Sequence, residues 1–99
     1  MLDEAVSARA VAWHSGGVRW RIARGPATPK PAVTLSAERP PAMADLTLWI
    51  SGEAELAWAA DSGAEPVTEH YEISSGLGLN ACLDDFESYL GLLRRLPYS

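Results

Sequence analysis

DLTLWISGEAELAWAA, residues 45–60, is the stretch that decides the fold. Apolar side chains alternate with polar ones on both sides of Ser51-Gly52, which is typical of two half-buried strands joined by a tight turn. The predicted inner faces are Leu46, Leu48 and Ile50, then Leu56, Trp58 and Ala60. Because the connection is so short, the two strands are expected to pair as an antiparallel hairpin.

The same periodicities extend outward from this hairpin in both directions. Alternation predicts further strands at 18–22, 32–37 and 67–73, and helical spacing predicts helices at 2–14 and 80–96. Breaks are expected at 25–31 and 38–44, which are rich in proline, and Asn80 is the expected N-cap of the second helix. The sequence therefore predicts an α+β fold: an antiparallel meander sheet of about five strands, with an N-terminal and a C-terminal helix packed on one face.

The 99 residues are enough for a single domain, residues 1–99, with one modest core. No apolar run reaches the roughly 20 residues of a membrane-spanning helix, and the acidic start lacks the pattern of a signal peptide. A cytoplasmic protein is expected. The predicted core is Trp13, Val18, Trp20, Ile22, Val33, Leu35, Leu46, Leu48, Ile50, Leu56, Trp58, Val67, Ile73, Leu83, Phe86, Leu90 and Leu93.

Charge is distributed unevenly along the chain, whose net charge is −5. No lysine or arginine occurs between Ile50 and Leu93, although carboxylates are frequent there. Such a segment repels phosphate, which disfavours nucleic acid as a partner. Two interpretations stay open: a solvated acidic surface, or a surface complementary to a basic protein.

No group of residues predicts an active site. The sequence from Gly76 to Ala81 matches a dinucleotide-binding fingerprint, but the chain ends too soon for the acidic residue and the strand that this fingerprint requires, so a glycine turn is expected instead. His70 and Glu72 share a strand face, yet two ligands do not make a metal site. Cys82 is expected to be a small buried side chain of the second helix. Neither a metal nor a cofactor is therefore predicted.

Trp49 is the most informative side chain on the other face of the sheet. It lies opposite in parity to Leu48, and Glu55, His70 and Glu72 are expected to share its face. A tryptophan among alanines and carboxylates is typical of a partner-binding anchor, although a surface packing role stays open. The predicted partner-binding residues are Trp49, Glu53, Glu55, Glu69 and Glu72.

Residues from about Pro31 to Leu93 resemble the TriTu-type immunity proteins of bacterial polymorphic toxin systems. The segments that carry the resemblance are PAVTL at 31–35, DLTLWISGEAEL at 45–56, DSG at 61–63, EHYE at 69–72, and the closing pattern of Leu83, Phe86 and Leu90. The resemblance implies a cytoplasmic antitoxin that binds and blocks a toxin domain, in the best-known case an ADP-ribosyltransferase acting on elongation factor Tu.

The sequence thus favours a non-enzymatic immunity protein whose partner is a cognate toxin domain with a basic surface. Neither a nucleic acid nor a membrane is expected as a partner. Two alternatives remain. One is an adaptor or secretion-chaperone-like module that binds a partner without inhibiting it. The other is a small enzyme or ligand-binding domain that uses His70, Glu72 and Cys82.

Overall fold

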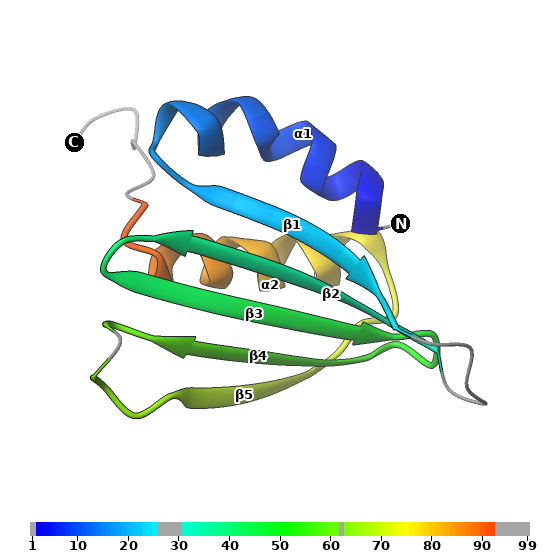
Figure 1. Ribbon diagram of the computed structural model, residues 1–99. Coiled ribbons are helices and arrows are strands. Elements are labelled where there is room, and N and C mark those ends of the chain that lie inside the picture. Colours follow the sequence, from blue (N-terminus) through cyan, green and yellow to red (C-terminus); the bar gives the residue numbers. More distant parts are fainter. Residues whose placement is uncertain (1, 26–30, 62, 93–99) are drawn as a thin grey trace, which may run out of the picture.

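Five antiparallel strands form one sheet in the computed structural model, which describes residues 2–25, 31–61 and 63–92. The spatial order of the strands follows the chain, so each strand pairs with the next (Figure 1). The elements in sequence order are α1 (Leu2–Ser15), β1 (Arg19–Arg24), β2 (Ala32–Arg39), β3 (Ala42–Trp49), β4 (Glu53–Ala59), β5 (Val67–Glu72) and α2 (Gly76–Tyr89). This meander with a helix before and after it confirms the predicted α+β fold.

Both helices contribute to one core on a single face of the sheet, and α2 lies behind the sheet in Figure 1. The register aligns Ile22, Leu35, Leu46 and Leu56 in one row across the first four strands, and the last three of these side chains are fully buried. Phe86 of α2 is buried in the same core, against these strands. Neither described helix is long and apolar enough to cross a membrane.

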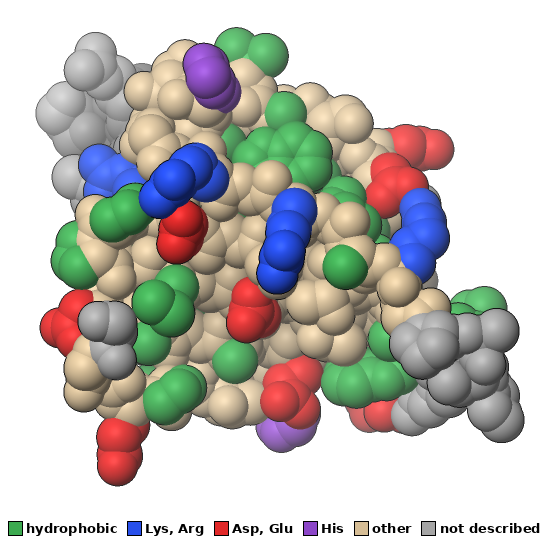
Figure 2. Space-filling model, viewed as in Figure 1, with side chains coloured by type: hydrophobic (Ala, Val, Ile, Leu, Met, Phe, Trp, Pro, Cys, Tyr) green, Lys and Arg blue, Asp and Glu red, His purple; other side chains and the backbone are tan. Residues whose placement is uncertain are grey.

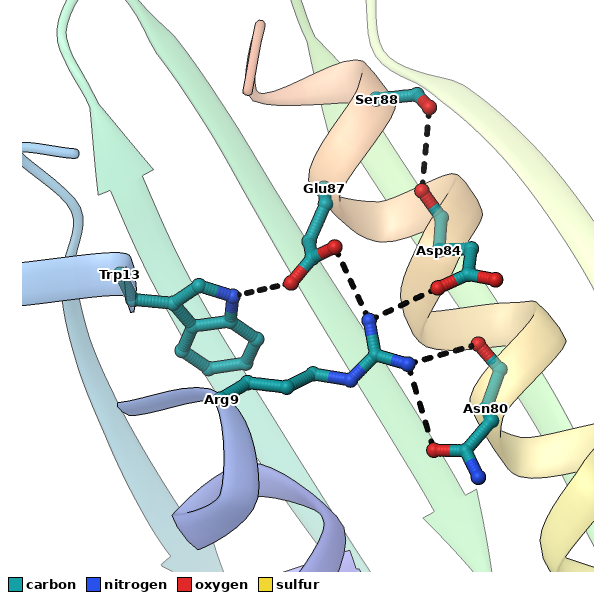
Figure 3. A network of polar contacts seen from close by, with 6 residues as sticks. All are labelled: Arg9, Trp13, Asn80, Asp84, Glu87 and Ser88. Atoms are coloured by element: carbon teal, nitrogen blue, oxygen red, sulfur yellow. Dashed lines mark hydrogen bonds and ion pairs between the residues drawn. The ribbon is translucent and has the colours of Figure 1, made fainter. Parts of the chain in front are cut away.

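A polar cluster joins α1 to α2 at the edge of this core (Figure 3). The indole Nε1–H of Trp13 donates to Glu87 Oε2 at 2.6 Å, and Arg9 Nη1 lies 3.0 Å from Glu87 Oε1 and 3.0 Å from Asp84 Oδ1. Arg9 Nη2 also donates to the backbone and side-chain oxygens of Asn80. Glu87 is buried, and its carboxylate contacts the Trp13 indole and the Arg9 guanidinium of the other helix.

The predicted break at 38–44 is wrong. Strand β2 continues to Arg39 and β3 begins at Ala42, so only Pro40 and Pro41 form the turn, with a cis peptide bond between them. Ala37 and Ala44 face each other in the ladder and are buried. The prolines therefore sit where no ladder hydrogen bond is required of them, and the flanking residues pair normally.

Helix α2 begins four residues earlier than expected, and its N-cap is Ser75, not Asn80. The Ser75 side chain accepts a hydrogen bond from the backbone N–H of Gly78 at 3.2 Å, which satisfies a donor of the first turn. Gly76 and Gly78 accordingly lie inside the helix rather than in a turn before it. At the other end, Gly91 has φ +78°, the left-handed conformation that commonly follows a helix.

Three members of the predicted core are exposed. Ile50 is 78% exposed because β3 ends at Trp49, so Ile50 has left the strand whose parity it follows. Trp20 and Val67 have the inner parity but lie on the two edge strands, where they remain 38% and 44% exposed. Leu93 lies outside the described residues.

Candidate partner-binding surface

The sheet face opposite the helices is covered by no described element, and it carries the side chains expected there. The register places Arg21, Ser36, Asp45, Ala57 and Thr68 in one row across the five strands. Figure 2 views the molecule from this face: arginines lie over its upper part, and the charged side chains coloured in its lower part, over β4 and β5, are carboxylates and a histidine. We call this surface the open face.

The turn between β3 and β4 places Trp49 and Glu53 side by side on the open face. Gly52 has φ +96°, and a Cβ atom there would lie only 2.7 Å from the backbone oxygen of Ile73. The Ile73 N–H in turn donates to Gly52 O at 2.7 Å. Only glycine meets both the conformation and the close approach, so this turn fixes the residues on either side of it.

Four of the five predicted partner-binding residues come together at this corner of the open face, which we call the acidic corner. Trp49, Glu53, Glu55 and Glu72 line a shallow hollow of about 320 Å³, together with His70. Glu53 is directly opposite Glu72 across the β4–β5 ladder, and Glu55 is directly opposite His70, whose Nδ1 lies 3.8 Å from Glu55 Oε2. Two carboxylates paired directly across a ladder repel each other, so this corner favours positive charge.

Glu69, the fifth predicted residue, does not belong to this group. It has the parity of the inner face, where Tyr89 of α2 donates to Glu69 Oε1 at 2.6 Å and the Tyr71 hydroxyl lies 2.8 Å from Glu69 Oε2. The hydrogen bonds from Tyr89 and Tyr71 lower the pKa of Glu69. Its position among apolar residues of the same parity in 67–73 was the one signal in the sequence for this inward orientation.

Tyr71 and Asp85 complete the inner cluster, and no pattern in the sequence singled out either of them. The Tyr71 hydroxyl is also 2.8 Å from Asp85 Oδ2, so its single proton is shared between two carboxylates. Burial, with these two carboxylates beside it, raises the pKa of Tyr71. Tyr89 stacks on Trp58 with ring centroids 4.4 Å apart. The cluster therefore attaches β5 to α2 and shows how an edge strand is held in place.

The residues considered for an enzyme are separated by the sheet. His70 and Glu72 lie on the open face, whereas Cys82 belongs to α2 and is fully buried in the core on the other side of the sheet. Burial raises the pKa of the Cys82 thiol to about 12, with the nearby Asp85 charge adding to it. Within residues 2–25, 31–61 and 63–92, no group of three or more histidine, cysteine or acidic side chains is placed to hold a metal ion.

Comparison of the chain with known protein families, with curated proteins and with solved structures gave no match. The candidate surface therefore has to be interpreted from its own chemistry.

Proposed function

We propose that this protein is an immunity protein that binds a basic toxin domain through the open face and blocks its activity. The observation that carries the proposal is the corner where Trp49 and three carboxylates line one hollow, on a sheet face that no described element covers. Tryptophan is enriched among the residues that dominate binding energy, and surrounding charges steer a complementary partner.

The resemblance to TriTu-type immunity proteins supports the same assignment, because it rests in part on the stretch from Asp45 to Leu56 that forms this corner. The separation of Cys82 from His70 and Glu72 supports binding over catalysis by those three residues. On this proposal the protein acts by occupying a surface of the toxin in the cytoplasm, and needs no cofactor.

The experiment is co-expression in bacterial cells with the toxin domain encoded by the neighbouring gene. The parent chain is expected to restore growth, and Trp49→Ala is expected to protect less. Val11→Ala is the control, because Val11 is an exposed apolar residue on α1, away from the open face. A neighbouring gene product that is harmless alone, or equal protection by all three chains, contradicts the proposal.

A further inference from the structure

Arg21 differs from every other described arginine in its contacts. Arg9, Arg19 and Arg24 each pair with a carboxylate, and Arg39 donates to the backbone oxygen of Gly16 at 2.8 Å. Arg21 is exposed on the open face, and within the part of the chain that the structure describes its guanidinium makes no ion pair or hydrogen bond. Asp45 lies in the same row two strands away, about 10 Å between the backbones, and its carboxylate forms no ion pair with Arg21 among the described residues.

An exposed apolar side chain lies near Arg21 on the open face. Arg21 lines a hollow of about 500 Å³ on the β1–β3 side of this face, together with Met43, which is 40% exposed, and with the ion pair of Arg19 and Glu38. Arginine and methionine are enriched at protein interfaces. An apolar contact beside an arginine without a partner is therefore present on the open face, away from Trp49.

The size of the open face indicates that a stable partner covers both sides. Five strands about 4.8 Å apart and six to eight residues long present roughly 600 Å². A standard protein interface buries about 800 Å² on each partner. The acidic corner alone is too small for such an interface, so the partner also lies over Arg21.

We propose that Arg21 is a second docking point on the open face and receives a carboxylate of the partner, while the acidic corner receives its basic side chains. The proposal rests on the proposed function and specifies the partner: a protein whose docking surface is basic at one side and bears an acidic residue at the other. The two points are three strands apart across the sheet, about 14 Å, and Glu55 and Glu53 lie two and four residues along β4 from the row of Arg21. The separation is therefore roughly 16–20 Å, which exceeds the Debye length of about 8 Å, so the charges do not cancel each other. This separation fixes the orientation of the partner. A nucleic acid does not fit, because its phosphates would lie over Glu53 and Glu55.

The test measures the affinity of the neighbouring gene's toxin domain for the parent and for Arg21→Glu. We expect the variant to bind about tenfold more weakly or worse, because a like charge replaces the complementary one. Ser7→Glu/Ala8→Glu is the control, since it makes the same change of net charge on the exposed surface of α1 and is expected to bind as the parent does. Arg21→Gln, which only removes the charge, is expected to fall between them.

A reversal of charge on the toxin identifies the contact. One acidic residue of the toxin, changed to arginine, is expected to restore binding to Arg21→Glu and to weaken binding to the parent. Unchanged affinity of Arg21→Glu, an equal loss in the control, or the absence of any restoring residue overturns the inference. If Arg21→Glu binds normally while Glu53→Lys/Glu55→Lys does not, only the inference about Arg21 fails. If the parent itself does not bind the toxin domain, the proposed function fails and the inference fails with it.

Discussion

Cys82 shows how burial decides the behaviour of a reactive side chain. Its thiol is fully buried and its pKa is raised to about 12, so almost no thiolate is present near neutral pH. We expect a thiol-specific reagent to modify the native protein slowly at pH 8 and the urea-unfolded protein quickly, as measured by mass spectrometry. Cys82→Ala should lower the free energy of unfolding by about 1 kcal/mol and leave toxin binding unchanged. Rapid labelling of the folded protein with loss of binding would contradict this role.

Glu69 makes the stability of the protein depend on pH. Tyr89 and Tyr71 donate to its carboxylate and lower its pKa below the ordinary value of 4.5. Since the charged form is favoured in the folded state, this stabilisation is complete above pH 4.5 and is lost as the pH falls through the lower folded pKa. The difference in free energy of unfolding between the parent and Glu69→Gln should therefore shrink below about pH 4.5. In a Tyr71→Phe/Tyr89→Phe background the two donors are gone, and the difference should no longer change with pH.

At the level of the elements, the β3–β4 turn affects both the free energy of unfolding and the geometry of the acidic corner. Gly52→Ala places a Cβ atom 2.7 Å from the Ile73 carbonyl oxygen and forces alanine to adopt φ +96°. The free energy of unfolding is expected to fall by about 1–3 kcal/mol, as measured by urea unfolding, and toxin binding should weaken because Trp49 and Glu53 flank the turn. Gly63→Ala is the control, because Gly63 lies in another turn and a Cβ atom there meets nothing nearer than 3.4 Å. Equal stability of the two variants would contradict the role given to Gly52.

The contact between the two helices depends on Glu87. Glu87→Ala removes the acceptor of the Trp13 indole and one partner of Arg9, both of which are largely buried. We expect a loss of about 3 kcal/mol in the free energy of unfolding, because a buried donor is left without an acceptor. The exposed pair of Arg19 with Glu38, at 2.7 Å, offers the comparison: Arg19→Ala should cost less than about 1 kcal/mol. Similar losses for the two variants would show that burial of Glu87 contributes little.

For the whole molecule, strand and helix periodicity was sufficient to predict the meander and the face on which the helices pack. Periodicity could not locate the ends of elements, because Ile50 continues the alternation of β3 after the strand has ended. Pro40 and Pro41 appeared to interrupt two strands, yet a turn of two residues accommodates them. The alternation of the strands was sufficient to predict that Trp49, Glu55 and Glu72 share one face. The inward orientation of Glu69, in contrast, depends on tyrosines that only the folded chain brings to it.

The asymmetry of the open face leads to a kinetic prediction for the whole molecule. On the proposed function, the carboxylates that line the acidic corner act on the partner before contact, whereas Trp49 acts only after contact. Glu53→Lys/Glu55→Lys should therefore slow association with the toxin domain and weaken its dependence on salt, since steering is screened beyond about 8 Å at physiological ionic strength. Trp49→Ala should leave association nearly unchanged and accelerate dissociation. Surface plasmon resonance at several salt concentrations separates the two effects. If both variants associate and dissociate as the parent does, the toxin binds elsewhere and the open face is not the interface.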